Sequence, residues 1–519
     1  MNIFISGIGG SGAYYLARYF LNLGYNVNGS DLQESARAKE LLEKGAKITF
    51  NVTNTEHLNN VEWDLYIYSP ALRDDHIEVV FFKNKGIKMA DVGTYTDQLI
   101  TDYSQNKLSE TEKDAFNNSE IAPLFGVDWN KRKYIAITGT DGKTTTSSMV
   151  YHILNKLGLK AAMLTTLGLT VEGKNIDTGL HTTTPSSQEL FKLLNSEELD
   201  DIEYVVLEVT SHGLAMGRVA GAKFDVAVIT NITSEHLDYH KTWENYYEAK
   251  TRLFKHHLKE NGTLVINPGD VSYSKLQQDA TNRGLKPVAE IHNDLIIPQE
   301  IRTEYNVQNA SLAVNAIQKL IPGIGEIPKD ILVDFKSVKG RMEYLQTEPF
   351  TIIVDFAHTA NALMLVLSNL RNNLKEGAKL RVVFGCAGMR DPGKRIPMGK
   401  YSAEFADAVY ICPEDPRLEK LGDINAEILK GAELSFPEGT QYSDRVTLQT
   451  KDGKKVDIFQ SGSIQDRYDA IEQAINDCAV NDILVICGKG HEKSLCFGTT
   501  EYDWSDQDAV EKILISKNE

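Results

Sequence analysis

The chain has 519 residues, a length that suits roughly three to four domains, each with its own hydrophobic core. Hydrophobic residues make up 42% of the chain and charged residues 24%, the balance of an ordinary globular protein. The formal charge of −17 argues against nucleic acid or an anionic membrane as a main partner. It leaves room for a nucleotide, because backbone N–H groups, one or two lysines and Mg²⁺ hold phosphate on an acidic protein.

The cysteines and the N-terminal sequence indicate in which cellular compartment the protein is expected. The five cysteines form no CxxC pair, so we expect neither a disulfide framework nor a structural zinc site, which fits a reducing compartment. The N-terminus, MNIFISGIGGSG, has no basic segment before an apolar one, and no run reaches the ~20 apolar residues of a membrane span. We therefore expect a cytoplasmic protein without membrane insertion.

The N-terminal region alternates between strands and helices. Residues Asn2–Ser6 read as a buried strand, the Gly-rich turn 7–12 follows, and a helix runs to about Leu23. A second strand, Asn26–Gly29, leads to Asp31, and residues 65–70 read as another buried strand that ends in a turn. This alternation predicts a Rossmann-like parallel sheet. GIGGSG with Asp31 is a dinucleotide-type fingerprint, and by itself it leaves an NAD site open.

The stretch from about Thr101 to Lys133 has a different composition. Its segment SQNKLSETEKDAFNNSE is polar and charged, which is typical of a linker or an exposed helical insertion. A long α/β region then extends to about residue 337, and a third unit with further strands follows. We therefore predict an α/β protein divided into residues 1–105, a linker or insertion at 106–132, a central domain at 133–337 and a Rossmann-like C-terminal domain at 338–519.

A phosphate loop is predicted at the start of the central domain. The strand Lys133–Thr138 runs into GTDGKTTT and then an apparent helix, so several N–H groups point at one place where phosphate binds. Lys143 would reach the terminal phosphates, and the hydroxyl of Thr144 would ligate Mg²⁺. The spacing GxxGKT is shorter than the general P-loop pattern, since Ile137 stands in place of its first glycine. An ordinary turn with a lone lysine is the alternative, and the strand–loop–helix context with three threonines argues against it.

Two later strands end in polar residues that would lie beside the predicted phosphate loop, because parallel strands end at the same edge of the sheet. Strand Tyr204–Val209 delivers Glu208, where a second Mg²⁺ contact is needed after a phosphate loop, although this side chain could also cap the next helix. The next strand, Val226–Thr230, leads to His236 and His240. Lys250 follows, and composition alone does not separate it from a solvated helical lysine.

Several motifs in register resemble one family. GTDGKTTT, TTTP, EVTSHGLAMGRV and NITSEHLDYHKTWENYYEAK, in this order, resemble the central domain of the Mur ligases, and most of all the tripeptide-forming (MurE-type) enzymes. The likeness continues through Tyr305–Ala313, GRME, DFAHT, GCAGMRDPGKR and GKGHE, so it covers nearly everything from residue 133 onward. By contrast, the N-terminal segment with YSPALRDDHIEV looks like the UDP-binding domain of the alanine-adding (MurC-type) ligases.

The resemblance implies a role for each matching position. The implied catalytic positions are Lys143, Glu208, His236, Lys250 and His358. The implied ATP contacts are Gly139, Thr140, Asp141, Gly142, Lys143, Thr144, Thr145, Asn309, Arg341 and Asp355. Two Mg²⁺ ions would be held by Thr144, Glu208, His236 and Lys250, the last as the carbamate that the family forms at this lysine. The implied precursor contacts are Gly9, Gly10, Ser11, Gly12, Asp31, Thr182, Thr183, Thr184, Thr210 and Arg218.

The C-terminal unit would bind the incoming amino acid. The family builds that pocket from an arginine loop, a DNPR-like turn and the GKGHE loop, and the matching residues here are Arg390, Glu414, Asp415, Arg417, Gly488 and Glu492. Glu414-Asp415 replaces Asp-Asn of the family pattern. The extra acid would favour a cationic side chain such as that of lysine or ornithine, whereas Arg pairing could hold a second carboxylate. An ordinary surface turn before Pro416 is the alternative.

The expected function is therefore that of an ATP-dependent ligase. It would add a diamino acid, such as lysine, ornithine or diaminopimelate, to UDP-N-acetylmuramoyl dipeptide through an acyl-phosphate, and we expect a monomer. The alternatives are an alanine-adding or folylpolyglutamate-type ligase, a non-catalytic relative that binds the precursor, and a nicotinamide-dependent oxidoreductase.

Overall fold

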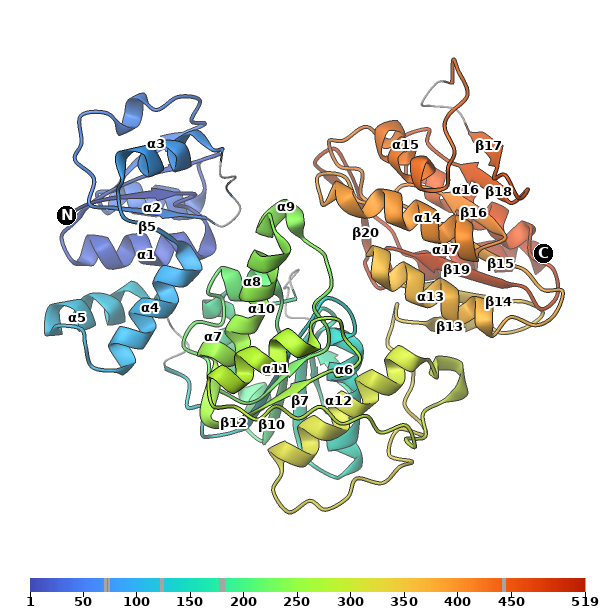
Figure 1. Ribbon diagram of the computed structural model, residues 1–519, viewed down its shortest axis with the longest axis horizontal. Coiled ribbons are helices and arrows are strands. Elements are labelled where there is room, and N and C mark those ends of the chain that lie inside the picture. Colours follow the sequence, from blue (N-terminus) through green and yellow to red (C-terminus); the bar gives the residue numbers. More distant parts are fainter. Residues whose placement is uncertain (70–71, 73–74, 122–125, 177–182, 441–444, 519) are drawn as a thin grey trace. The chain divides into compact units, whose positions relative to one another are not determined.

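The computed structural model describes residues 1–69, 72, 75–121, 126–176, 183–440 and 445–518 (Figure 1). The chain forms two compact units. The first holds Met1–Ile296 and Gln308–Leu332, and the second holds Ile297–Val307 and Val333–Glu519. In the described residues, no helix is both long and apolar enough to cross a membrane.

The first unit begins with a five-stranded parallel sheet in the order β3-β2-β1-β4-β5. Its strands are β1 (Asn2–Ser6), β2 (Asn26–Asp31), β3 (Lys47–Phe50), β4 (Leu65–Tyr68) and β5 (Met89–Asp91). Its helices are α1 (Ser11–Asn22), α2 (Ala36–Glu43), η1 (Glu56–Leu58), α3 (Ile77–Lys85), α4 (Val92–Ser104) and α5 (Glu110–Ser119).

Helix α5 lies in the polar stretch of sequence that connects the last strand of the first sheet, β5, to the first strand of the central sheet, β6 (Lys133–Thr138). A capping box between Ser109 and Glu112 starts this helix. Its Ala115 and Phe116 are buried in the core that α1 and the first sheet share. The stretch therefore contains a packed helix, although its sequence is mostly polar.

The central sheet has seven strands in the order β12-β11-β6-β10-β7-β8-β9. The strands from β12 to β7 are parallel, and β8 and β9 extend the sheet by antiparallel pairing. The strands are β6 (Lys133–Thr138), β7 (Ala161–Thr165), β8 (Gly168–Val171), β9 (Lys174–Ile176), β10 (Tyr204–Glu208), β11 (Phe224–Ile229) and β12 (Leu258–Ile266). The helices are α6 (Lys143–Lys156), α7 (Ser187–Leu194), η3 (Glu197–Leu199), α8 (Ser211–Ala215), α9 (Leu237–His240), α10 (Trp243–His256) and α11 (Tyr273–Asn282). Two further helices, η4 (Gln299–Ile301) and α12 (Glu304–Leu320), follow.

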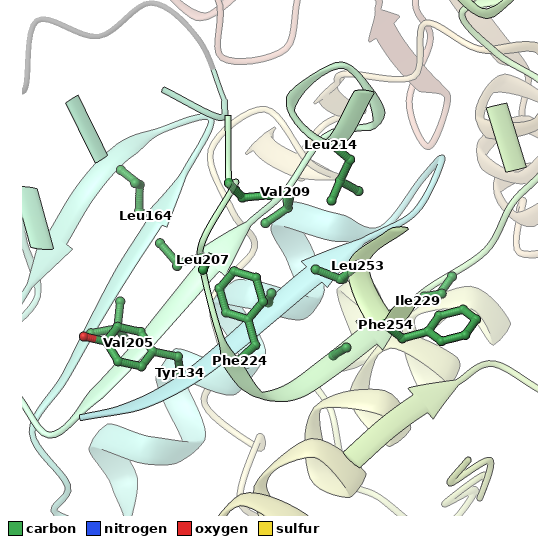
Figure 2. Packing of buried hydrophobic residues seen from close by; sticks show 14 of the residues in the cluster. Tyr134, Leu164, Val205, Leu207, Val209, Leu214, Phe224, Ile229, Leu253 and Phe254 are labelled. Carbon is green, nitrogen blue, oxygen red and sulfur yellow. The ribbon is translucent and has the colours of Figure 1, made fainter. Parts of the chain in front are cut away.

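The central core fixes which strand ends lie together. Tyr134, Leu207 and Phe224 come from three neighbouring strands and pack with Leu253 and Phe254 of α10 (Figure 2). In register, Glu208 pairs with Ile137 and Ile229 pairs with Thr138. The carboxyl ends of β6, β10 and β11 therefore meet at one edge of the sheet, where α/β proteins bind their ligands.

The second unit is built on a seven-stranded mixed sheet in the order β13-β14-β19-β15-β16-β18-β17. The five inner strands are parallel, and the edge strands β13 and β17 pair antiparallel. The strands are β13 (Glu343–Gln346), β14 (Thr351–Asp355), β15 (Leu380–Phe384), β16 (Ala408–Ile411), β17 (Val446–Gln449), β18 (Lys455–Ile458) and β19 (Ile483–Cys487). A separate hairpin joins β20 (Ser494–Phe497) to β21 (Thr500–Asp503). The helices are α13 (Ala360–Asn372), η5 (Pro392–Lys394), α14 (Arg395–Phe405), α15 (Leu421–Gly431), α16 (Gln465–Asn476) and α17 (Asp506–Asn518).

The predicted fold class is confirmed. The chain carries three α/β sheets, each with parallel strands at its centre. The predicted strands at 2–6 and 133–138 match the observed bounds, and the other strands predicted in the first two sheets differ by one or two residues at their ends.

Candidate active site

The phosphate loop lies between β6 and α6. Helix α6 begins at Lys143, and Gly142 precedes it with φ of 79°, a left-handed conformation that glycine adopts without steric cost. Gly139 is also required, because a Cβ there would lie 1.8 Å from Thr230 Oγ1. Thr145 is half-buried in the first turn of α6. The N-terminal N–H groups of a helix have no intrahelical partner, so this turn is a natural site for phosphate.

Residues from the end of β11 brace the loop. Asn231 Oδ1 accepts hydrogen bonds from the backbone N–H of Thr140, at 3.1 Å, and of Asp141, at 2.9 Å. Thr230 Oγ1 donates to Asp141 O over 2.6 Å. The sequence motif contained Asn231, but its bracing role was not predicted.

Lys143 folds back on its own loop. Its Nζ donates to Thr140 O over 2.8 Å and to Gly139 O over 3.1 Å. The ammonium group therefore lies within the loop, where a terminal phosphate would meet it.

Glu208 faces the first turn of α6. Its Oε2 accepts a hydrogen bond from Thr144 Oγ1 over 2.9 Å, and both residues are buried. Thr166, just beyond β7, donates to Glu208 Oε2 over 3.3 Å. A hydroxyl and a carboxylate oxygen side by side are the hard oxygen donors that Mg²⁺ prefers, so this pair fits a magnesium ion. Thr166 was not predicted, and nothing in its local sequence marks it.

Lys250 is buried on α10, with 2% of its surface exposed. Its Nζ donates to Gly139 O over 2.6 Å and lies 4.6 Å from the centre of the Tyr246 ring. Burial and the nearby charge of Lys143 hold the pKa of the Lys250 amine well below its usual range. Lys250 is therefore part of the phosphate-loop surroundings, which composition alone did not reveal.

Tyr246 ties α10 to the loop. Its hydroxyl donates to Thr140 Oγ1 over 3.0 Å, and Thr140 Oγ1 also accepts from Thr233 N over 3.0 Å. Because Tyr246 lies one helical turn before Lys250, the two side chains share one face of α10. Nothing in the local sequence distinguishes Tyr246 from the other aromatic residues of this segment.

His236 precedes α9 and lies among other rings. It has φ of 57°, its Nε2 lies 3.5 Å from Glu235 Oε2, and its ring centre is 4.6 Å from that of His212. Burial lowers the pKa of the neighbouring His240 to about 3, so that imidazole is neutral. Within the described ranges, no three His, Cys, Asp or Glu side chains come together in metal-binding geometry.

The threonine segment lies beside Glu208. Thr184 Oγ1 lies 3.1 Å from Thr210 Oγ1, and Thr183 Oγ1 donates to Thr166 over 3.3 Å. Arg218 Nη1 donates to Thr184 O over 2.8 Å, which joins this segment to α8. Thr182 lies outside the described residues.

In the N-terminal sheet, the Gly-rich turn and Asp31 are in contact. Asp31 Oδ2 accepts a hydrogen bond from Gly9 N over 2.8 Å, and Gly10 N donates to Gly7 O over 2.9 Å. Helix α1 begins at Ser11. A Cβ at Gly12 would lie 2.7 Å from Met216 O, so glycine allows this turn to approach the segment after α8.

In the second unit, Asp355 organises the turn after β14. Its two carboxylate oxygens accept hydrogen bonds from Met342 N, at 2.6 Å, and Ala357 N, at 2.7 Å. The guanidinium of Arg341 lies 4.0 Å from the centre of the Phe356 ring. His358 Nδ1 lies 2.8 Å from Phe356 O. Asn309 belongs to the first unit, where its Oδ1 accepts from Thr146 over 3.2 Å.

Three of the residues predicted to hold the incoming amino acid, Asp415, Arg417 and Glu492, take part in polar contacts within the second unit. Asp415 Oδ1 accepts from Lys489 Nζ over 2.8 Å, and Lys489 pairs with Glu492 at 2.5 Å. Arg417 Nη1 donates to Gly388 O over 2.8 Å. Arg390 is exposed.

Glu414 is the unusual member of this group. It is buried, and among the described residues its Oε2 has no hydrogen-bond partner. A Cβ at Gly488 would lie 2.3 Å from this oxygen. Burial raises the pKa of the Glu414 carboxyl to about 7. A buried carboxylate oxygen without a partner is costly unless a ligand supplies the missing donor.

A phosphate loop, a facing hydroxyl–carboxylate pair and a buried lysine define a nucleotide-dependent enzyme that handles phosphate. Three family models match in chain order, namely Mur ligase family, catalytic domain at residues 2–104, Mur ligase middle domain at 137–311, and Mur ligase, glutamate ligase domain at 340–490. The chain belongs to the Mur ligase family, and it is an ATP-dependent amide ligase.

Two relatives cover most of the chain. A UDP-N-acetylmuramoyl-L-alanyl-D-glutamate--2,6-diaminopimelate ligase of Rickettsia conorii is 33% identical over 407 residues, 73% of this chain and 79% of the relative. A protein of the same description from Prochlorococcus marinus is 29% identical over 518 residues, 89% of this chain and 95% of the relative. Among solved structures, a bifunctional folylpolyglutamate synthase/dihydrofolate synthase from Yersinia pestis matches with a TM-score of 0.52 at 18% identity, covering 72% of this chain and 91% of that one. This last likeness concerns the fold alone.

Proposed function

We propose that the protein joins a diamino acid, as the third residue of the stem, to UDP-N-acetylmuramoyl dipeptide in the synthesis of the peptidoglycan precursor. The description shared by the two relatives, diaminopimelate ligase, supports this substrate class. The observation that carries the proposal is the buried Glu414, whose Oε2 has no hydrogen-bond partner among the described residues. A substrate ammonium group would supply that partner.

We assign one ligand to each part of the chain. Residues 1–105 would bind the UDP end of the precursor, 106–132 would connect, 133–337 would bind ATP, and 338–519 would bind the amino acid. The precursor contacts would be Gly9, Gly10, Ser11, Gly12, Asp31, Thr182, Thr183, Thr184, Thr210 and Arg218. The substrates of this reaction are small polar molecules of the cytoplasm, so we place the protein there. We propose that it acts as a monomer.

The nucleotide would lie on the phosphate loop. Within the loop 139–145, the N–H groups at the start of α6 and the ammonium of Lys143 would hold its phosphates, with Asn309, Arg341 and Asp355 as further contacts. Thr144 and Glu208, with His236, fit Mg²⁺, which when bound neutralises phosphate charge.

Lys250 would contribute as a carbamate. A lowered pKa leaves more of its amine uncharged, and only the uncharged amine attacks CO₂. The new N–C bond forms as one proton leaves, so a cation becomes an oxygen ligand of negative charge beside the loop. Thr144, Glu208, His236 and this carbamate would hold two Mg²⁺ ions, which would neutralise phosphate charge.

The reaction would proceed in two steps. The free carboxylate of the dipeptide attacks the terminal phosphorus of ATP, which gives an acyl-phosphate and ADP, while Lys143 stabilises the charge in transfer. The amine of the amino acid then attacks the acyl carbon, and phosphate leaves as the amide forms. His358 is assigned a catalytic role by its place in the DFAHT motif.

The amino acid would be selected by the second unit. We assign Arg390, Glu414, Asp415, Arg417, Gly488 and Glu492 to this pocket. Glu414 would pair with the distal ammonium of lysine, ornithine or diaminopimelate, and Arg417 or Arg390 with a carboxylate.

The test is phosphate release with ATP, Mg²⁺ and UDP-N-acetylmuramoyl dipeptide against a panel of diaminopimelate, lysine, ornithine and alanine. We expect turnover with at least one diamino acid and none with alanine. Lys143→Ala should abolish ADP release under the same conditions. Turnover with alanine alone would instead support an alanine-adding ligase, and full activity of Lys143→Ala would refute the assigned ATP site.

A further inference from the structure

A buried arginine on α16 lies behind the proposed amino-acid pocket. Arg467 has 0% of its surface exposed, and its partner Asp506, at the start of α17, is equally buried. Arg467 Nε donates to Asp506 Oδ1 over 2.8 Å, and Nη2 donates to Oδ2 over 2.7 Å. This bidentate geometry is the strongest arrangement for an arginine and a carboxylate.

The remaining donors of Arg467 hold the ends of two strands. Nη1 donates to Pro413 O over 3.2 Å and to Cys412 Sγ over 3.5 Å, just beyond β16. Nη2 donates to Cys487 O over 3.0 Å, at the last residue of β19. A guanidinium has five N–H groups, and the five contacts use them all.

The residues that follow these two strand ends belong to the proposed pocket. Glu414 comes directly after Pro413, and Gly488 comes directly after Cys487. The two loops are in close contact, since a Cβ at Gly488 would lie 2.3 Å from Glu414 Oε2. Lys489 Nζ bonds Asp415 Oδ1 over 2.8 Å one residue further along each loop.

The two strands are held in one sheet but are not paired with each other. In the sheet, β15 lies between β16 and β19, so the two loops leave strands that are not paired with each other. Arg467 bonds both strand ends at once and is anchored by Asp506. Arg467 therefore links the bases of the two loops, while Lys489 and Asp415 link them one residue further along.

We propose that Arg467 is a positioning residue that sets the spacing of Glu414 relative to Gly488 and Lys489, and thereby the affinity for the incoming amino acid. The inference rests on the proposed function of this pocket. It assigns Arg467 no contact with the substrate.

Arg467→Lys is the informative variant. Lysine keeps the charge opposite Asp506 but has only three donors in a different geometry, so it cannot hold both strand ends and the carboxylate together. We expect KM for the amino acid to rise about tenfold or more, with KM for ATP and for the precursor within about twofold of wild type and with a smaller change in kcat.

Arg381→Lys is the matched control. Arg381 pairs with Asp482, and the two side chains are also buried, at 8% and 3% exposure. This pair lies at the opposite ends of the strands, because Arg381 is the second residue of β15 and Asp482 precedes β19. We expect Arg381→Lys to lower the melting temperature to a similar degree without changing KM for the amino acid.

The outcomes distinguish a failure of the positioning role of Arg467 from a failure of the proposed function. Suppose that wild type turns over a diamino acid. The positioning role is then refuted if Arg467→Lys leaves KM for the amino acid unchanged, or if it raises KM for the amino acid, for ATP and for the precursor together. The same holds if Arg381→Lys raises KM for the amino acid equally. If wild type is silent with every amino acid, the proposed function fails first. Should Arg467→Lys not fold, Asp506→Asn, which keeps an acceptor for Nε, must produce the same selective rise in KM.

Discussion

Thr144 Oγ1 and Glu208 Oε2 lie 2.9 Å apart, although 64 residues separate them in the chain. One belongs to the first turn of α6 and the other ends β10, and the register of β10 on β6 brings them together. The hydrogen bond joins the residue that would ligate Mg²⁺ directly to the carboxylate that would complete the ligand set. The register of the sheet therefore places the two oxygens side by side.

Removing the Thr144 hydroxyl should weaken magnesium use. Thr144→Val keeps the shape of the side chain but loses one oxygen ligand and leaves buried Glu208 with one hydrogen bond fewer. We expect kcat/KM for ATP to fall about 10²-fold, with a higher Mg²⁺ concentration for half-maximal activity. A magnesium titration of phosphate release measures both, with Ser148→Ala on the same helix as the control. An unchanged magnesium dependence would contradict the assignment.

Tyr246 offers a pair of variants that separate its hydroxyl from its ring. Tyr246→Phe removes only the hydrogen bond to Thr140, whereas Tyr246→Leu also removes the ring against which Lys250 packs. We expect a loss of about tenfold in kcat/KM for ATP with Phe, and a further loss with Leu. Incorporation of ¹³C-labelled CO₂ at Lys250, followed by NMR, would report the effect on the carbamate. Equal activities of the two variants would mean that the ring has no role.

The pKa of Glu414 predicts how amino-acid binding depends on pH. Burial raises that pKa to about 7, so the carboxyl is protonated below this pH and charged above it. A cationic substrate group pairs only with the charged form. KM for the diamino acid should therefore fall as pH rises from 6 to 8 and then level off.

Glu414→Gln removes this titration. Its KM should be about 10- to 100-fold higher at pH 8 and nearly independent of pH over the same range. A pH profile of KM for wild type and variant makes the comparison, with KM for ATP as the internal control. A variant that keeps the wild-type slope would exclude Glu414 as the titrating group.

His257 should make the first unit sensitive to acid. Burial lowers the pKa of this imidazole to about 3, against 6.5 in an unfolded chain. Below pH 6.5 the unfolded state binds a proton that the folded state does not, so the stability contributed by His257 is present above 6.5 and lost as pH falls towards 3. At pH 5 the loss is about 2 kcal/mol in the free energy of unfolding.

His257→Gln should flatten this dependence, because glutamine does not titrate. Urea denaturation at pH 8 and pH 5 measures the difference between wild type and variant, and that difference should be smaller in the variant by about 2 kcal/mol. His491, in the second unit, is left intact and serves as an internal reference, since burial lowers its pKa to about 3 as well. A variant as acid-sensitive as wild type would show that His257 is not responsible.

Gly139→Ala should damage the phosphate loop. The new Cβ would lie 1.8 Å from Thr230 Oγ1, so either Thr230 or the loop must move. We expect ATP affinity to fall at least tenfold in a binding titration. Gly158→Ala is the control, because it meets nothing within 4 Å and its cost of about 1 kcal/mol arises only from φ of 74°. Normal ATP binding by Gly139→Ala would contradict the close packing described here.

The fold was largely predictable because its signals are local. Buried strands of four to six residues, each followed by a turn and a helix, mark a parallel sheet wherever they occur. The antiparallel strands β8, β9, β13 and β17 were harder to predict, because short, partly exposed strands have weak apolar patterns. Their antiparallel pairing depends on tertiary contacts that no local pattern reports.

Residues of the candidate site were predictable only where they belong to a recognisable sequence motif. Lys143 and Thr144 follow from the loop spacing, and Lys250 follows from the resemblance alone. Tyr246 and Thr166 escaped notice because their roles depend on hydrogen bonds to residues 106 and 42 positions away. The exposed Arg390 and the partnerless Oε2 of Glu414 likewise depend on how loops pack, which spacing does not determine.

The position of Lys143 has a kinetic consequence. Its ammonium donates hydrogen bonds to the carbonyls of Gly139 and Thr140, which occupy the donor sites that phosphate oxygens would take. When a nucleotide binds, phosphate oxygens would replace these carbonyls as the hydrogen-bond acceptors of the Lys143 ammonium. The ammonium would therefore have an acceptor throughout the exchange. Because side-chain hydrogen bonds of this kind open within picoseconds to nanoseconds, the exchange adds no slow step, and the observed stopped-flow binding rate should rise linearly with the ATP concentration.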